Sequence, residues 1–315
     1  MSNHMESLLA ISPIDGRYKK KLLKLNQYFS EYGYFKYRLY IELLYLKKIC
    51  LSLEKNLFKK VYKIIENVGH DFDIKECLKI KEYEKKINHD VKAIEYYLRD
   101  KFEKYNINQY IHLGLTSQDI NNTAIIFMLK EFTNKHYLPT IVILLEHLKN
   151  KSNNKIWKET KMIGLTHGQP ATLTSMGDYF KVFHYRLETE IKKLIKYKFY
   201  TKFGGAVGNL EAHKICYPEI NWDKWTNNFI ETDLHLYLQE YTTQIMNYES
   251  LVELFNIVMR INSILIDFAV DIWLYISKEY FHYDNQGNVG SSTMPHKINP
   301  ILFENAEGNL IMANG

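Results

Sequence analysis

Residues 251–276 read LVELFNIVMRINSILIDFAVDIWLYI, and this stretch decides the class of fold. Its apolar side chains recur every three or four positions, which is the spacing of one face of an α-helix. The expected stripe comprises Leu251, Leu254, Phe255, Val258, Ile261, Leu265, Phe268 and Ile272. A stripe of about six turns is too long for a small globule, so it predicts a bundle of long helices.

The same helical spacing continues through most of the remaining chain. Long helices are expected at about 121–149, where Pro139 predicts a kink or a break, and at about 175–200. Shorter ones are expected at 22–53, 57–68 and 75–103. No convincing alternating pattern indicates a strand, and no repeat or low-complexity linker divides the sequence. We therefore predict an all-α protein, with a small N-terminal helical domain at 1–111 and a long-helix bundle domain at 112–315.

Composition excludes several classes of protein. Apolar residues make up 46% of the 315, which is ample for a packed core. The net charge of +5 is spread along the chain without a basic arm, which argues against nucleic-acid binding. Cys50, Cys77 and Cys216 are too few and too scattered for a disulfide framework or a metal site. The N-terminus lacks the pattern of a signal peptide, and Asp267 and Asp271 interrupt the most apolar segment, so we expect a cytoplasmic protein without a membrane span.

The segment with the most chemical character is residues 290–300, GSSTMPHKINP. Two serines and a threonine follow a glycine and precede Lys297 and Asn299. A loop of this kind can present a hydroxyl base, backbone N–H donors and a fixed cation together. By composition alone, the same residues also fit a turn and a helix start, with Ser or Thr as the cap and Pro near the first helical position.

Two further polar segments precede expected long helices. Residues 166–172, THGQPAT, place His167 between a threonine and a glycine, although a lone histidine is more often structural than catalytic. Residues 112–122, HLGLTSQDINN, indicate a helix N-terminus. Thr116, Ser117 and Asp119 can cap that helix, or the exposed N–H groups there can bind an anion.

Two segments nearer the N-terminus are suited to a phosphate or a polar ligand. Residues 12–18, SPIDGRY, offer Arg17 for bidentate contact with a phosphate and Tyr18 as its neighbour, although an exposed turn with a solvated arginine is the alternative. Residues 88–93, NHDVKA, place His89 and Asp90 at an expected helix start, where a surface cap is the ordinary expectation. The segment GGAVGN at 204–209 lacks the preceding strand and the spacing of a dinucleotide-binding loop.

The segments at 290–300, 166–172 and 112–122 together resemble the fumarase and aspartase superfamily, whose members eliminate fumarate from succinyl substrates. The segments at 12–18 and 88–93 resemble the nucleotide-side motifs of the adenylosuccinate lyase family, in particular its bacterial long form. GGAVGN and the segment YTTQI at 241–245 fit the same family. Members of this family continue beyond the signature loop with further bundle helices and a C-terminal domain, so the resemblance implies a C-terminally truncated chain.

The resemblance implies β-elimination of fumarate from adenylosuccinate to give AMP. It also implies the same elimination from succinyl-aminoimidazole carboxamide ribotide to give aminoimidazole carboxamide ribotide, and both reactions are steps of purine biosynthesis. Ser291 would be the base and His167 the acid. The implied substrate-binding residues are Arg17, Tyr18, Asn88, His89, Asp90, Thr116, Ser117, Gln244, Lys297 and Asn299. Backbone N–H groups near Ser292 and Thr293 would assist, His112 would support His167, and Glu304 would orient that histidine pair. No metal and no organic cofactor is implied.

The resemblance also implies a homotetramer whose active sites combine segments from three subunits, and partners limited to purine nucleotide substrates, without nucleic acid or membrane. Two other interpretations stay open at this point. One is another fumarate-releasing lyase, such as an argininosuccinate lyase. The other is an inactive truncated remnant, or a subunit that only packs against another polypeptide.

Overall fold

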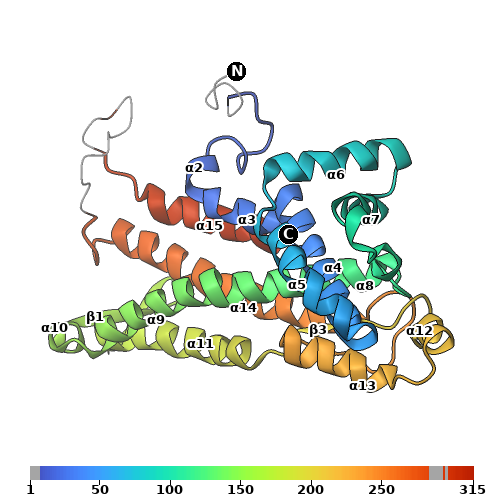
Figure 1. Cartoon of the computed structure of the whole chain (residues 1–315). Coiled ribbons are helices and arrows are strands. Elements are labelled where there is room, and N and C mark those ends of the chain that lie inside the picture. Colours follow the sequence, from blue (N-terminus) through green and yellow to red (C-terminus); the bar gives the residue numbers. More distant parts are fainter. Residues whose placement is uncertain (1–7, 284–293, 295–296) are drawn as a thin grey trace. The chain divides into compact units, whose positions relative to one another are not determined.

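The computed structural model of the chain describes residues 8–283, 294 and 297–315 (Figure 1). Helices make up most of these residues, which confirms the predicted all-α class. The chain divides into two compact units, each made of two separate segments. The first unit comprises Met1–Thr133 and Lys198–Tyr248, and the second comprises Asn134–Tyr197 and Glu249–Gly315. The domain boundary expected near residue 111 stays a prediction.

Helix α4 (Glu31–Leu53) is the central element of the first unit and packs against α5 (Lys55–His70), α6 (Ile74–Ile87) and α8 (Ser117–Phe132). Ser30 caps its N-terminus, where Ser30 Oγ accepts a hydrogen bond from the Gly33 backbone N–H at 3.0 Å. Its buried side chains point in several directions, because neighbouring helices cover much of its circumference. They include Phe35, Leu39, Leu43, Leu46 and Ile49.

The other elements of the first unit are short. The helices are α2 (Lys19–Leu22), α3 (Asn26–Phe29), α7 (Asp90–Lys101), α12 (Glu211–Cys216) and α13 (Trp222–Asn227). Single helical turns are η1 (Leu23–Leu25), η2 (Glu103–Tyr105), η3 (Asn108–Tyr110) and η5 (Asn228–Asp233). Strands β3 (Tyr200–Thr201) and β4 (Tyr237–Leu238) pair in parallel. The loops that connect these short elements to α4, α7 and α8 carry the polar motifs.

The second unit contains the long helices that the sequence predicts. Helix α11 (Met176–Lys196) packs against both α9 (Leu138–Asn153) and α14 (Glu249–Ser277), and α15 (Ile301–Asn314) packs against α14 (Figure 1). A short helix, α10 (Lys155–Glu159), follows α9. Polar links join α11 to α14, including a hydrogen bond from Arg260 Nε to Glu190 Oε2 at 2.8 Å and one from Tyr197 Oη to the Ser250 carbonyl at 2.6 Å. Within the described ranges, no helix has the length and apolar character needed to cross a bilayer.

Helix α14 confirms the long helix that was predicted for residues 251–276. Leu254, Ile261 and Ile272 of the expected stripe are buried. Phe255, also expected on that stripe, is 48% exposed, because it lies on a second apolar face with Val252 and Met259 that the unit does not cover.

Helix boundaries follow local signals that periodicity alone does not give. The break that Pro139 predicted in the helix at 121–149 is confirmed: α8 ends at Phe132, a π-helical turn, η4 (Thr133–Tyr137), follows, and Pro139 lies in the first turn of α9. The expected helix at 75–103 is two helices. Asn88, with φ 53°, ends α6 in the left-handed conformation, and His89 caps α7.

A β-hairpin surrounds His167 and was not predicted from the sequence. Strands β1 (Lys161–Thr166) and β2 (Gln169–Ser175) pair in antiparallel fashion. The two residues between them, His167 and Gly168, both have positive φ, 53° and 70°, as in a type I′ turn. Because most side chains of β2 are exposed, the alternation of buried and exposed positions that reveals a strand is weak.

Candidate active site

The loop at 112–117 leads into α8 and caps its N-terminus. The Thr116 backbone N–H donates to Asp119 Oδ2 at 2.9 Å, as part of a capping box, and Ser117 is the first residue of the helix. The N-terminal N–H groups of α8 therefore lie at the end of a fixed loop. Both alternatives from the sequence, a helix cap and an anion site, remain compatible with this geometry.

A fully buried ion pair fastens this loop to the GGAVGN segment. Lys202 Nζ lies 2.7 Å from Asp119 Oδ1 and also donates to the Gly205 carbonyl at 2.6 Å. The same Asp119 carboxylate accepts from the backbone N–H of Gly204 at 2.9 Å and of Gly205 at 3.1 Å. Burial lowers the pKa of Lys202, and the negative charge of Asp119 offsets part of this shift by raising it. Sequence reasoning missed Lys202, whose partner lies 83 positions away.

The GGAVGN segment also touches the YTTQI segment. Gly208 has φ 83°, and a Cβ atom there would come within 2.0 Å of the Thr242 carbonyl oxygen. Only glycine fits this approach. The structure thus brings 112–122, 204–209 and 241–245 together in the first unit, with the Gln244 side chain exposed.

His112 lies between two buried carboxylates. Its Nδ1 is 2.5 Å from Glu42 Oε1, and its Nε2 is 3.9 Å from Glu95 Oε1. Burial disfavours the charged ring, but the charge of Glu42, the hydrogen bond to it and the charge of Glu95 together raise the pKa of His112. Neither glutamate was predicted, although Glu42 is a charged residue in an otherwise apolar stretch of α4.

The NHDVKA segment is held by the same helix. His89 caps α7 through Nδ1, which accepts from the Lys92 backbone N–H at 3.2 Å. Asp90 pairs with Arg38 at 2.6 Å. Burial opposes the Asp90 charge, but Arg38 and the Val91 N–H lower the pKa of this carboxyl. Arg38, which is buried and lies 3.6 Å from the centre of the Tyr34 ring, was also missed by sequence reasoning.

Helix α4 thus organises the predicted site residues of the first unit. Arg38 and Glu42 are one turn apart, and they hold Asp90 and His112 respectively. Arg17 follows an exposed turn and is itself exposed, and Tyr18 is half-buried.

The remaining predicted residues belong to the second unit. His167 lies exposed at the tip of the β1–β2 hairpin. Lys297 and Asn299 precede α15, and Glu304 is in its first turn. Ser291, the expected base, lies outside the described residues, as do Ser292 and Thr293.

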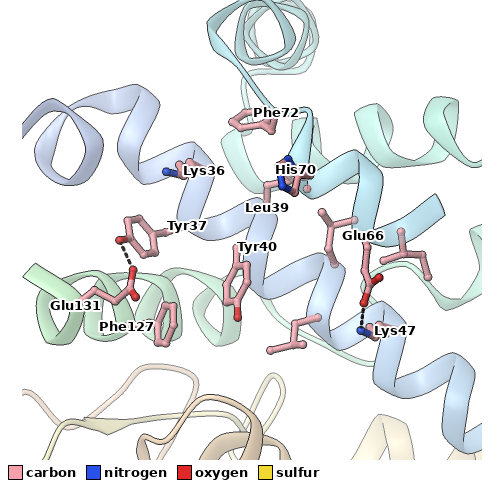
Figure 2. A pocket seen from close by; sticks show the side chains of 14 residues that line it. Lys36, Tyr37, Leu39, Tyr40, Lys47, Glu66, His70, Phe72, Phe127 and Glu131 are labelled. Atoms are coloured by element: carbon pink, nitrogen blue, oxygen red, sulfur yellow. Dashed lines mark hydrogen bonds and ion pairs between the residues drawn. The ribbon is translucent and has the colours of Figure 1, made fainter. Parts of the chain in front are cut away.

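A separate pocket of about 610 Å³ lies between α4, α5 and α8 (Figure 2). Its polar groups are largely occupied by one another: Tyr37 Oη donates to Glu131 Oε2 at 2.8 Å, and Lys47 pairs with Glu66. None of the predicted site residues lines it. The chemistry of the motifs is therefore concentrated around Glu42 and His112 rather than in this hollow. Among the described residues, no group of three or more His, Cys, Asp or Glu is placed to hold a metal ion.

His213 supports the loop that carries His112. Tyr45 Oη donates to the Leu113 carbonyl at 2.6 Å and lies 2.8 Å from His213 Nε2. Because the tyrosine proton is used on Leu113, Nε2 must carry the imidazole proton. Gly114 faces the ring so closely that a Cβ there would lie 2.7 Å from Cε1.

The buried His213 predicts an acid-sensitive fold. Burial lowers the pKa of His213 to about 4, below its usual 6.5, so its neutral form stabilises the protein fully above pH 6.5. This contribution is lost as the pH falls towards 4. Between pH 7.5 and 4.5, we expect the unfolding free energy to fall by about 2–3 kcal/mol more than in His213→Gln. Urea unfolding at both pH values tests this, and equal losses in the two proteins would contradict it.

Comparison with known proteins identifies the relatives of this chain. Residues 16–315 match a family model described as Lyase. The chain is 44% identical to an adenylosuccinate lyase of Dictyostelium discoideum, covering 98% of this chain and 69% of that protein. It is 39% identical to that of Vibrio cholerae, with 98% and 70% covered. Escherichia coli K12 has an adenylosuccinate lyase that is 38% identical, with 98% and 69% covered.

Solved structures show the same fold. A fumarate lyase from Mesorhizobium sp. BNC1 aligns with a TM-score of 0.72 at 15% identity, covering 92% of this chain and 63% of that one. The 3-carboxy-cis,cis-muconate lactonizing enzyme from Pseudomonas putida aligns with a TM-score of 0.72 at 19% identity, covering 93% and 63%. This chain thus spans less than two thirds of these two structures and about two thirds of the curated relatives.

Proposed function

Because this chain belongs to the adenylosuccinate lyase family, within the fumarase and aspartase superfamily, we propose that it is a C–N lyase that eliminates fumarate from adenylosuccinate to give AMP. The observation that carries this proposal is identity of 38–44% to adenylosuccinate lyases over 98% of the chain. The second proposed substrate is succinyl-aminoimidazole carboxamide ribotide, which has the same succinyl group on an amine nitrogen.

In the proposed reaction, Ser291 takes a proton from the succinyl carbon next to the one that bears nitrogen. The electrons of that C–H bond form the new C=C bond, and those of the C–N bond leave with the nitrogen. His167 protonates the nitrogen as it departs. Fumarate and the amine are then the balanced products.

A serine hydroxyl is a poor base at its ordinary pKa, so its conjugate base needs local positive charge. Lys297 and Asn299 follow Ser291 in sequence and precede α15, so they are suited to this role and to holding the carboxylate that takes up carbanion charge. One well-aimed donor contributes about 3 kcal/mol to such a transition state. Glu304, in the first turn of α15, is proposed to orient the histidines.

The first unit is proposed to bind the nucleotide. In support, α4 holds both the NHDVKA segment, through Arg38 and Asp90, and the loop of His112. The residues proposed to contact substrate there are Arg17, Tyr18, Asn88, His89, Asp90, Thr116, Ser117 and Gln244. His112 is proposed to support His167. The elimination as written uses these side chains and needs no organic cofactor.

We propose a homotetramer with shared active sites and a domain boundary near residue 111. In support of assembly, α14 leaves Val252, Phe255 and Met259 exposed on one face, at 54%, 48% and 41%. Apolar residues at this helical spacing favour packing against another helix. A cytoplasmic location agrees with three free cysteines, two of them buried.

A substrate-choice assay on the purified chain tests the function, combined with a measurement of native mass. We expect fumarate release from adenylosuccinate, negligible release from argininosuccinate, and the mass of a tetramer. Release from argininosuccinate alone would favour the alternative of an argininosuccinate lyase. A stable assembly that releases no fumarate from either substrate would favour a packing subunit and overturn the proposal.

A further inference from the structure

Glu42 carries a buried carboxylate that has no role in the proposed reaction. Its side chain is 1% exposed, Oε1 contacts His112 Nδ1 at 2.5 Å, and Oε2 makes no hydrogen bond within the described part of the chain. An ionised carboxylate buried in this way needs a counter-charge.

The charged groups around Glu42 are already paired with others. On α4 itself, Arg38 pairs with Asp90 at 2.6 Å. On α7, Glu95 pairs with Lys92, one turn away on the same helix, at 2.6 Å. On α8, Asp119 pairs with Lys202 at 2.7 Å, and the nearby His213 is neutral. His112 is therefore the cation available to Glu42.

The backbone holds His112 against this carboxylate. His112 has φ 56°, a left-handed conformation that costs a non-glycine residue energy. The next residue is anchored by the hydrogen bond from Tyr45 Oη to the Leu113 carbonyl. Gly114 then packs on the His213 ring. These contacts hold the backbone of the loop, and Glu42 on α4 holds the His112 ring, whose side chain is 11% exposed.

We propose that Glu42 is a positioning residue that keeps His112 as an imidazolium, so that the Nε2–H of His112 binds an oxyanion of the substrate. The Nδ1 proton is committed to Glu42, which leaves Nε2 as the donor, so His112 would support His167 by holding the substrate and not by a direct hydrogen bond. Glu95, 3.9 Å away, is beyond hydrogen-bond distance of Nε2. This inference rests on the proposed function, because the oxyanion belongs to adenylosuccinate, either its phosphate or a succinyl carboxylate.

Glu42→Gln in the full chain is the decisive variant, because glutamine keeps the size and the acceptor oxygen but removes the charge. NMR titration should show the pKa of His112 falling by about one unit or more. The alkaline limb of kcat/KM should move to lower pH by the same amount, because the imidazolium is then lost earlier. Glu42→Asp should restore part of both shifts.

Two product inhibitors identify the oxyanion. A roughly tenfold rise in the inhibition constant of AMP in Glu42→Gln assigns the phosphate, and the same rise for fumarate assigns a carboxylate. Glu66→Gln is the matched control, because Glu66 pairs with Lys47 at the separate pocket. This variant should change neither inhibition constant.

The outcomes separate this inference from the proposed function. If the His112 pKa falls in Glu42→Gln while the pH limb and both inhibition constants stay unchanged, Glu42 has only a structural role and the inference is wrong. If Glu42→Gln does not fold, His112→Gln should show the same loss of inhibitor binding, and unchanged binding there also overturns it. If the wild-type chain does not turn over adenylosuccinate, the proposed function fails, while the titration and AMP binding still test the pairing.

Discussion

Replacing Ser291 by alanine is expected to lower kcat for adenylosuccinate by about 10²–10⁴-fold, the usual contribution of a positioned proton acceptor. Without the hydroxyl, nothing in the proposed mechanism removes the succinyl proton, and water is a weak and poorly placed substitute. KM should change little, because binding is proposed to rest on other side chains. Steady-state absorbance kinetics measure both constants.

Ser292→Ala is the matched control for this prediction. Only the backbone N–H near Ser292 is proposed to act, so removal of its hydroxyl should leave kcat within a few-fold of the wild type. Equal losses in the two variants would mean that the loop is merely sensitive to substitution. Full activity in Ser291→Ala would remove serine from the role of base.

Replacing Lys202 by methionine is expected to destabilise the protein by about 3–5 kcal/mol, which is typical of breaking a buried ion pair. Lys202 and Asp119 are both fully buried, and methionine would leave the Asp119 carboxylate without its cation. The backbone N–H groups of Thr116, Gly204 and Gly205 would still donate to that carboxylate. The change in unfolding free energy is measured by urea denaturation at pH 7.

Lys155→Met is the control for Lys202, because Lys155 and Glu159 form an exposed pair with N–O separation of 3.9 Å. Exposed pairs contribute at most about 1 kcal/mol, so we expect a change well under that value. A change in Lys202→Met as small as that in the control would show that the buried pair does not hold the loop at 112–117 to GGAVGN.

The helices were largely predictable because periodic burial is a local property of sequence. Helix α14 covers the stretch 251–276, and α11 lies within the expected 175–200. The break at Asn88 depends on the conformation of a single residue, which periodicity does not report, whereas Pro139 predicted the break after Phe132. The hairpin around His167 escaped prediction because the side chains of β2 are mostly exposed and β1 has a single buried position, so neither strand shows a clear alternation.

The motifs of the site could be predicted from the sequence, but the residues that hold those motifs in place could not. His112, Asp90 and Thr116 stood out because each belongs to a polar segment beside an expected helix. Arg38, Glu42 and Lys202 act on partners far along the chain; the Glu42 and His112 positions, for example, are 70 apart. One local signal was present: Arg38 and Glu42 are charged residues one turn apart in a helix that is otherwise mainly apolar. Such residues require buried partners.

The mechanism rests on elimination rather than hydrolysis of the C–N link, and product analysis distinguishes the two. Proton NMR of adenylosuccinate incubated with the assembled protein should show the olefinic signal of fumarate appearing together with AMP, in equal amounts. Formation of aspartate and IMP instead, which requires water to attack the purine ring, would contradict the account.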